Sequence, residues 1–232
     1  MSMQCWSAGS LTSAILVALT AISVSAFPAA AAETQAVSGL PQTARNSPGV
    51  LDPADFAVAP IRDPRESLAG LNLPALRQTS ALVPNLHLVT PAVIRGGQPT
   101  AQALGLLKQV GVKTIVNLRN EEVCIDEERA QARGLGLNYV SIPLDVFNHP
   151  SDKAIEQFLQ VATDPTQLPI YVHCLHGQDR TGTMCAIYRI DQQGWSADRA
   201  YQEMLGYGFR SYLTPLTQTV YSFAQNRSRF RQ

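Results

Sequence analysis

One short stretch of this chain concentrates reactive and charged side chains. It reads YVHCLHGQDRTGTM, from Tyr171 to Met184, and holds one cysteine, two histidines, one aspartate and one arginine. Five residues separate Cys174 from Arg180, and Thr181 follows the arginine directly. A cysteine can act as a nucleophile, and a guanidinium can bind two oxygens of an anion at once. The stretch therefore predicts a site in which Cys174 attacks an anionic group held by Arg180.

The segments on either side of this stretch decide where its reactive groups lie. The apolar run PIYVHC predicts a buried strand that ends at Cys174, and TGTMCAIYRIDQQG predicts a helix that ends at Gly194. The loop between them must turn sharply, so its successive N–H groups can face one concave space at the start of the helix. Such a loop suits a tetrahedral oxyanion, and its positive field favours the thiolate form of Cys174.

A tetrahedral anion facing Cys174 points to phosphoryl transfer. In-line attack by the thiolate on a bound phosphoryl group forms a phosphocysteine intermediate, which a second step resolves. Thr181 can hydrogen-bond the sulfur and make it a better leaving group in that step. This chemistry rests on positioning and charge stabilisation, so no cofactor and no metal are expected. His173 and His176 flank Cys174, but the sequence has no second cluster of metal ligands to accompany them.

Short apolar runs alternate with helical periodicity from residue 86 onward. The predicted strands cover residues 86–90, 92–98, 112–119, 138–144 and 169–174. The predicted helices cover residues 100–110, 122–134, 151–163, 181–194, 196–208 and 213–227. The alternation requires crossover connections, which predicts an α/β fold with a central, mostly parallel sheet and helices on both faces. Reactive loops of such folds lie at the carboxyl ends of the strands, where the loop after Cys174 belongs.

The first 32 residues predict a secretory signal peptide. An uncharged apolar run from Leu11 to Val24 precedes small residues that allow cleavage after Ala32 or, alternatively, after Ala26. The run is short for a membrane span, although an uncleaved anchor is the alternative. The prediction is a periplasmic or secreted protein with no stable membrane insertion after cleavage.

Residues 33–83 are rich in alanine and proline and predict a linker or loosely packed arm. The leucines of LAGLNLPALRQ could nevertheless pack on the domain that follows. The periodic region, residues 84–232, predicts one catalytic domain. The 232-residue chain has a formal net charge of zero, so nucleic acid is not expected as a partner.

Three cysteines would remain after cleavage: Cys124, Cys174 and Cys185. The odd number leaves at least one free thiol in an oxidising compartment unless chains pair with one another. Cys185 lies in an apolar helix and is predicted to pack in the core. Cys124 follows a strand at the expected active edge, which raises the hypothesis of a protective disulfide with Cys174; the alternative is a packed helix cysteine.

The segment HCLHGQDRTG resembles the signature of the cysteine-dependent protein tyrosine phosphatases: His-Cys, five residues, Arg, then Ser or Thr. VIRGGQPT, VKTIVNLRNE, YVSIPL and MCAIYRIDQQGW are similar to the framework of the dual-specificity-like branch, in particular its exported bacterial tyrosine phosphatases. The resemblance covers roughly Leu86 to Gly208. It implies a dual-specificity phosphatase-like fold for residues 84–232.

The resemblance also implies roles for individual residues. Cys174 would be the nucleophile, Arg180 would bind phosphate, and His173 would orient the loop and help to keep the thiol acidic. Substrate would contact the loop, whose predicted binding residues are His173, Leu175, His176, Gly177, Gln178, Asp179 and Thr181. Gln178 could orient the hydrolytic water or be a solvated loop residue.

In this family an aspartate about thirty residues before the cysteine protonates the leaving group. Asp145 lies 29 positions before Cys174, after a predicted strand, and is the favoured candidate. Asp152 begins a helix, where an aspartate usually complements the helix dipole. Asp179 lies inside the loop and also resembles the candidate acid of myotubularin-type phosphoinositide phosphatases. His149 could contribute as well.

The loop contains no lysine, and Asp179 adds negative charge to it. This composition favours a phosphorylated protein, above all phosphotyrosine, over a highly phosphorylated inositol. The enzyme alternative is a phosphoinositide or inositol phosphate phosphatase. A phosphate-binding module without turnover is the alternative from another class, and the intact Cys174, Arg180 and Thr181 argue against it. Sulfur transfer of the rhodanese type has no need of the arginine.

Two arginines outside the loop need separate interpretation. Arg95 precedes Gly96 and Gly97, which suggest a tight turn with positive φ, and is predicted to be structural. Arg119 ends a strand at the active edge, where it could attract phosphate, but a surface ion pair is the favoured prediction.

Overall fold

The computed structural model describes residues 70–230. The predicted signal peptide, residues 1–32, lies outside the described residues. Residues 33–69 of the predicted arm lie outside them as well. Within the described part of the chain, no helix combines the length and the apolar character needed to cross a membrane.

A five-stranded sheet forms the centre of the domain, in the order β1-β2-β5-β3-β4. The strands are β1 (His87–Thr90), β2 (Val93–Gly96), β3 (Thr114–Asn117), β4 (Asn138–Ser141) and β5 (Ile170–His173). Only the β1–β2 pair is antiparallel, and the other neighbours pair in parallel. All residues of β2, β3 and β5 are buried, as expected for strands covered on both faces. The predicted fold class is confirmed.

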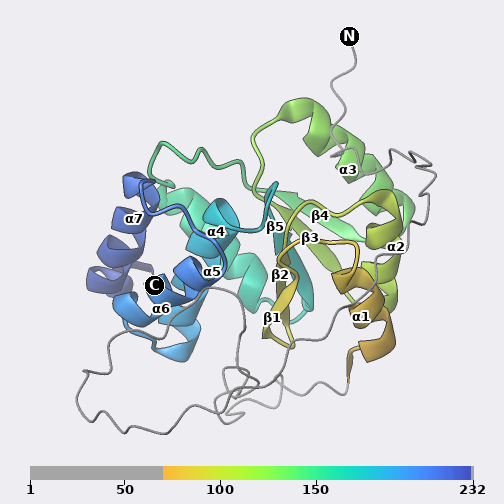
Figure 1. Ribbon diagram of the computed structural model, residues 1–232, viewed down its shortest axis with the longest axis horizontal. Helices are drawn as coiled ribbons and strands as arrows, with labels where there is room; N and C mark the ends of the chain where they lie inside the picture. Colours follow the sequence, from red (N-terminus) through yellow and green to blue (C-terminus); the bar gives the residue numbers. More distant parts are fainter. Residues whose placement is uncertain (1–69, 231–232) are drawn as a thin grey trace, which may run out of the picture. The chain divides into compact units, whose positions relative to one another are not determined.

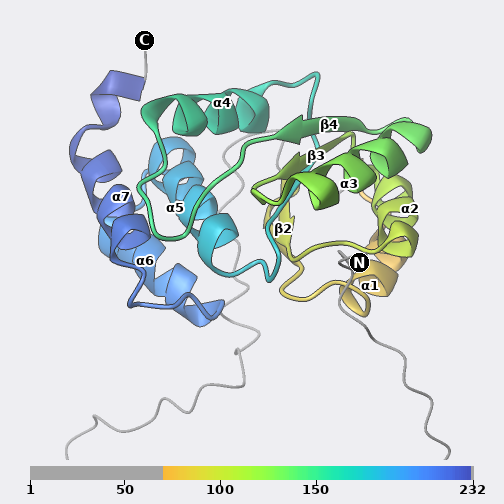
Figure 2. The ribbon, with the colours of Figure 1, turned by 90° about the horizontal axis from the view of Figure 1, so that it is seen from above.

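Helices cover both faces of the sheet (Figure 2). One side carries α1 (Leu73–Ser80), α2 (Ala101–Val110) and α3 (Glu122–Gly134). The other side carries α4 (Asp152–Thr163), α5 (Asp179–Gln193), α6 (Ala197–Gly206) and α7 (Thr214–Gln225), followed by a 3-10 turn, Arg227–Phe230. Successive strand residues point to opposite faces, so Ile115 packs in the core under α1 and α2 while Val116 packs in the core under α4 to α7.

The domain begins earlier than the predicted boundary at residue 84. Residues 73–80 form α1, which packs on α2, and Leu71 and Val83 are buried in the same core. Asn72 caps the helix by accepting the N–H of Ala75 at 3.2 Å. Pro74 suggested an irregular arm, but it lies in the first turn of α1, where no intrahelical N–H is required. Residues 70–83 therefore belong to the domain.

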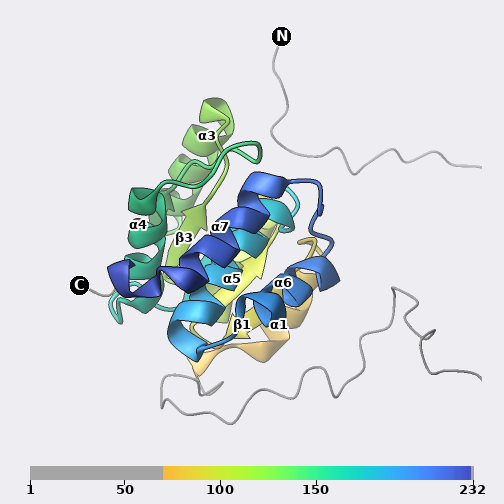
Figure 3. The same ribbon diagram turned by 90° about the vertical axis from the view of Figure 1, so that its left-hand side faces the viewer.

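The register of the parallel strands brings four loops to one edge of the sheet. Gly96 of β2 and Asn117 of β3 both pair with His173 of β5, and Asn117 also pairs with Ser141 of β4. The segments that follow these strands must therefore leave at the same edge. Figure 3 shows the segments that enter α3, α4 and α7 on the side toward which the arrow of β3 points. The loop that contains Cys174 leaves at this edge.

Candidate active site

The loop between β5 and α5 turns its carbonyl groups away from its concave side. Each carbonyl from residue 174 to residue 177 accepts a hydrogen bond from a group outside these four residues. In order, the donors are His173 Nδ1 (3.2 Å), the N–H of Gln98 (3.0 Å), Asn85 Nδ2 (2.9 Å) and Arg95 Nη2 (2.8 Å). Among the described residues, the N–H groups of residues 175–178 donate to no protein group. Such a row of unpaired N–H groups binds anions, and the N-terminus of α5 strengthens the effect.

Gly177 is required at its position in the loop. Its φ is +73°, and a Cβ there would lie 2.5 Å from the carbonyl carbon of Gly96. Gly96 is itself needed because its own Cβ would lie 2.3 Å from Tyr171 Oη. The expectation of positive φ at Gly96 and Gly97 is wrong, because neither adopts it; close approach explains both glycines instead.

Replacement of Gly177 by alanine is expected to lower the free energy of unfolding by about 2–4 kcal/mol, the sum of left-handed backbone strain and overpacking. The phosphatase-type loop would be displaced as well, and we expect hydrolysis of p-nitrophenyl phosphate to fall at least tenfold, roughly the consequence of misplacing reacting groups by a fraction of an ångström. Urea unfolding and steady-state kinetics measure the two effects. Gly134→Ala is the matched control, since a Cβ at Gly134 meets no atom within 4 Å. Equal stability of the two variants would contradict the prediction.

Cys174 is a buried, free thiol at the base of this loop. The hypothesised disulfide with Cys124 is therefore not formed. Thr181 is fully buried, and its Oγ1 has no hydrogen-bond partner among the described residues, so the predicted bond to the sulfur is not formed either. Cys185 is also free and lies in the core, as predicted; burial raises the pKa of its thiol to about 11.

Arg180 connects the loop to two neighbouring segments at the same edge. Its Nη1 donates to Asn120 Oδ1 at 2.9 Å and to the carbonyl of Leu144 at 3.3 Å. Glu121 Oε2 lies 4.0 Å from the same nitrogen. The guanidinium is thus held in the first turn of α5, between the segments that follow β3 and β4.

Asp145 directly follows Leu144, whose carbonyl Arg180 contacts. Its carboxylate is exposed and accepts the N–H of Phe147 and the amide of Asn148, both at 2.8 Å. The two bonds orient the carboxylate within its own turn, and the contact of Leu144 with Arg180 brings that turn to the loop.

The two rival aspartates have other partners. Asp179 is buried and accepts from the N–H of Arg210 at 3.0 Å and from its Nη2 at 2.6 Å. The side-chain hydrogen bond that Arg210 donates to Asp179 raises the pKa of Arg210. Asp152 pairs with Arg229 at 3.0 Å in the first turn of α4. Asp179 therefore joins the start of α5 to the segment before α7, and Asp145 is the candidate acid that the contacts favour.

A buried carboxylate that the sequence interpretation missed supports the loop from behind. Glu128 Oε2 lies 3.1 Å from His173 Nε2 and also accepts from Asn117 (2.6 Å) and Tyr139 (2.9 Å), while its Oε1 accepts from Gln98 at 2.7 Å. Both ring nitrogens of His173 thus face oxygen acceptors, an arrangement that the doubly protonated ring satisfies.

The partners of Glu128 stabilise its negative charge. Burial raises its pKa, but the charge of His173 and the three hydrogen bonds to Oε2 outweigh burial, so the pKa lies below its usual value. The pKa of Tyr139 lies far above the ordinary range of tyrosine, mainly because its phenol is buried and also because the negative charge of Glu128 is nearby. The signal in the sequence was a glutamate on the same face of α3 as the buried Ile125 and Ala132.

The remaining predicted residues lie around the loop in different settings. Leu175 is half-buried and His176 is exposed. The side chain of Gln178 packs against Gly208, where a Cβ would lie 2.8 Å from Nε2. The interpretation of Arg95 as structural agrees with its bond to Gly177 and its position 4.0 Å over the ring of Tyr207.

Arg119 forms the predicted ion pair, with the exposed Glu121, but the arginine side chain itself is buried. Its Nε lies 3.1 Å from Glu121 Oε2, its Nη1 donates to Gln98 Oε1 at 3.1 Å, and its side chain is almost wholly buried. Gln98 Nε2 also donates to Glu128 Oε1, so Glu121 and Glu128 are connected through Arg119 and Gln98. No group of three or more potential metal-ligating side chains occurs within residues 70–230.

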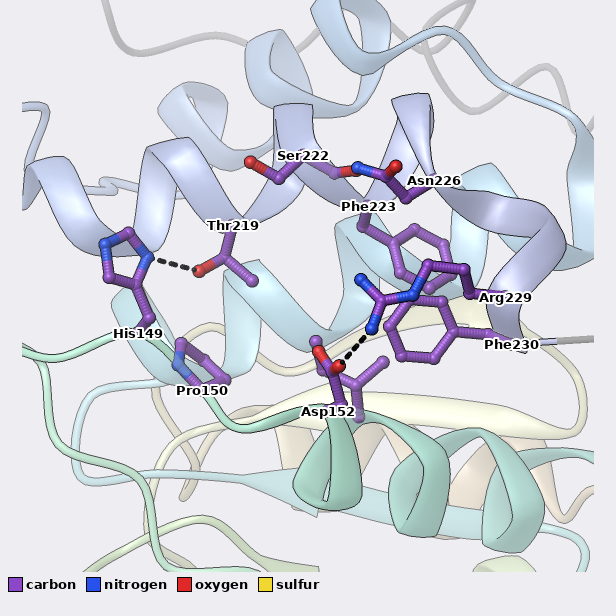
Figure 4. Close-up of a pocket in the computed structure, with 10 residues that line it drawn as sticks. His149, Pro150, Asp152, Thr219, Ser222, Phe223, Asn226, Arg229 and Phe230 are labelled. Atoms are coloured by element: carbon purple, nitrogen blue, oxygen red, sulfur yellow. Dashed lines mark hydrogen bonds and ion pairs between the residues drawn. The ribbon is translucent and has the colours of Figure 1, made fainter.

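A cavity of about 150 Å³ lies apart from the loop, between the start of α4 and the C-terminal helices (Figure 4). His149 contacts Thr219 there at 3.2 Å, and Arg229 contacts Asp152. None of Cys174, Arg180 and Asp145 lines the cavity. His149 is therefore engaged with α7 rather than with the loop.

Comparisons with known proteins agree with this geometry. A family model described as "DSP-PTPase phosphatase fused to NAD+ Kinase" matches residues 81–215. The dual specificity protein phosphatase TpbA of Pseudomonas aeruginosa (strain UCBPP-PA14) is 32% identical over 125 residues, which cover 54% of this chain and 55% of TpbA. The chain thus matches about half the length of that relative.

The chain is also similar to one solved structure and to one more distant relative. The crystal structure of P. aeruginosa TpbA superposes with a TM-score of 0.54 at 26% identity and covers 67% of this chain and 99% of that chain. The inositol diphosphatase DSP4 of Arabidopsis thaliana is 26% identical over 122 residues, which cover 51% of this chain and 61% of the relative.

Proposed function

This chain belongs to the DSP-PTPase phosphatase family, and on that premise we propose that it hydrolyses phosphomonoesters through a phosphocysteine intermediate. The substrate that we propose is a protein carrying phosphotyrosine. One observation carries the proposal. The free thiol of Cys174 lies at the base of a loop with four N–H groups that have no partner within residues 70–230, and the first turn of α5, which holds Arg180, follows directly in the chain.

The reaction takes two displacements at phosphorus. The N–H groups of the loop and Arg180 bind the phosphoryl oxygens, and Cys174 Sγ attacks phosphorus in line with the ester oxygen. The P–S bond forms, the P–O bond breaks, and Asp145 gives its proton to the leaving oxygen. Water then attacks phosphorus, the sulfur leaves, and the Asp145 carboxylate accepts the proton of the water.

Replacement of Asp145 by asparagine is expected to lower kcat about 10²–10⁴-fold for a phosphotyrosine peptide, because the leaving phenoxide loses its proton donor. The loss should be smaller for p-nitrophenyl phosphate, whose leaving group is weakly basic. Steady-state kinetics with both substrates test this. Asp152→Asn is the matched control and should retain wild-type kcat. Asp179→Asn should instead lower the thermal midpoint, since it breaks the pair with Arg210. A large loss in Asp179→Asn with none in Asp145→Asn would reverse the assignment.

The charges around the loop support a substrate with a single phosphate. Among the described cations near the loop, Arg119 is paired with Glu121 and Arg210 is paired with Asp179, while Arg95 is buried and donates to the carbonyl of Gly177. Several phosphates would need further cations. The test compares a phosphotyrosine peptide with inositol hexakisphosphate, in the presence of a metal chelator and a reductant. Preference for the inositol substrate would overturn the proposed substrate class.

We also propose that the protein acts outside the cytoplasm, in the periplasm or as a secreted protein. The apolar run from Leu11 to Val24 and the small residues before Glu33 support this. Mass determination of the protein purified after expression in a Gram-negative host tests it: cleavage after Ala32 or Ala26 is expected, and an intact N-terminus in the cytoplasmic fraction would contradict it.

A further inference from the structure

Three large apolar side chains of the described domain are unusually exposed. They are Phe147 (72% exposed), Tyr212 (68%) and Val123 (65%), whereas the next most exposed large apolar residue, Leu73, reaches only 41%. Single exposed apolar residues are normal on protein surfaces. Their positions relative to the active site, however, are not scattered.

Phe147 is fixed relative to the proposed acid. Its backbone N–H donates to Asp145 Oδ1 at 2.8 Å, so the turn that orients the carboxylate also places the phenyl ring. The ring itself is not used to pack the domain. Phe147 therefore lies on the same turn as Asp145, with its ring exposed to solvent.

The segment that contains Tyr212 is held against the loop that contains Cys174. It lies two residues after Arg210, whose N–H and guanidinium bind Asp179, the residue before Arg180. The guanidinium of Arg210 lies 5.9 Å from the ring of Tyr212. Tyr212 thus stands on the segment before α7 that is joined to the first turn of α5.

Val123 is placed through the segment after β3. It lies three residues after Asn120, whose Oδ1 accepts from Arg180 at 2.9 Å. Its neighbours Glu121 and Glu122 are exposed. All three apolar residues therefore lie on segments at the edge of the sheet where the catalytic loop leaves (Figure 3).

We propose that Phe147, Tyr212 and Val123, here called the apolar rim, bind apolar side chains that flank the phosphotyrosine of a protein substrate. The proposal rests on the proposed function and adds a sequence preference to it. Aromatic and aliphatic side chains gain most from contact with other apolar groups when water is excluded. Glu121 is paired with Arg119, but the carboxylate of Glu122 is exposed and disfavours acidic flanking residues and also anionic lipid surfaces. A neutral protein segment is the occupant that this charge fits.

The test uses the full chain with three substrates: p-nitrophenyl phosphate, a phosphotyrosine peptide with leucine on both sides, and the same peptide with serine in place of leucine. Phe147→Ser and Tyr212→Ser should each lower kcat/KM for the leucine peptide about five- to tenfold, and Val123→Ser about threefold, according to the apolar area removed. Values for p-nitrophenyl phosphate should change less than about twofold, because this small substrate does not reach the rim. Leu135→Ser, at the opposite end of α3, is the matched control and should leave all three substrates unaffected.

The outcomes separate this proposal from the proposed function. Equal losses on both peptides, or none, would overturn the rim while leaving phosphatase activity established. The same variants are also assayed with a fourth substrate, a monophosphorylated phosphoinositide in neutral vesicles. Losses confined to that substrate would mean that the rim contacts lipid, which also overturns the proposal. If the wild type hydrolyses none of the substrates, the proposed function fails. Fluorescence anisotropy with the labelled leucine peptide then decides the rim alone: about five- to tenfold weaker binding by Phe147→Ser supports it, and unchanged binding overturns it.

Discussion

Replacement of Cys174 by serine is expected to abolish phosphomonoester hydrolysis, with kcat lowered roughly 10⁴–10⁶-fold, the range seen when a covalent nucleophile is removed. A serine hydroxyl stays protonated near neutral pH and has no adjacent base here comparable to those that activate serine in hydrolases. The N–H groups that face the phosphate site belong to the backbone of residues 175–178 and are unchanged by the substitution. The variant should therefore retain phosphate binding while losing turnover.

Hydrolysis of p-nitrophenyl phosphate, together with peptide binding by calorimetry, measures both parts of this expectation. Cys185→Ala is the matched control, because Cys185 is the other free thiol among the described residues and is buried in the core. It should keep its kcat and lose some thermal stability through the small cavity left behind. Residual turnover in Cys174→Ser, or loss of turnover in Cys185→Ala, would place the nucleophile elsewhere.

Replacement of Glu128 by glutamine is expected to lower the free energy of unfolding by about 2–4 kcal/mol at neutral pH, the usual consequence of leaving buried partners unsatisfied. Four donors converge on the carboxylate, three on Oε2 and one on Oε1. The amide has one acceptor oxygen, so its NH₂ group would face at least one of the donors that the carboxylate now accepts from. His173 would lose the negative charge beside its ring, and the loop that begins at Cys174 would be held less firmly.

The effect of Glu128→Gln should depend on pH. The pKa of Glu128 in the folded protein is below its usual value, although burial opposes this, because His173 and the hydrogen bonds stabilise the carboxylate. The unfolded chain therefore binds the proton first as pH falls, and the stabilising contribution is present above the unfolded pKa of about 4.3 and is lost as pH falls through the folded value.

Urea unfolding of the wild type and Glu128→Gln at neutral pH and below about pH 4 measures this dependence. The difference in the free energy of unfolding between the wild type and Glu128→Gln should be largest at neutral pH and smaller in acid. Glu127→Gln, on the exposed face of the same helix, is the matched control and should have little effect at either pH. Equal destabilisation by the two substitutions would show that Glu128 has no special role.

The catalytic loop could be predicted from the sequence because its determinants are local. Seven consecutive residues contain Cys174, Gly177 and Arg180. The apolar runs on either side specify the strand and the helix that flank the loop. Asp145 was favoured because the family resemblance implies an acid about thirty residues before the cysteine and because parallel strands share an edge at their carboxyl ends. The position of the loop needs only periodicity and order along the chain, whereas the choice of acid also needs the resemblance.

Tertiary structure alone decided which polar groups are partners. Glu128 meets His173 across 45 residues, and Asp179 meets Arg210 across 31, so no local pattern reveals either pair. The same holds for Gly177, whose need for a glycine comes from the backbone of Gly96 on another strand. The sequence by itself determined the elements and the reactive loop, because periodicity and turn chemistry are short-range. The structure decided the buried carboxylate behind the loop, the partner of each aspartate and the exposed rim, because these depend on how distant segments pack.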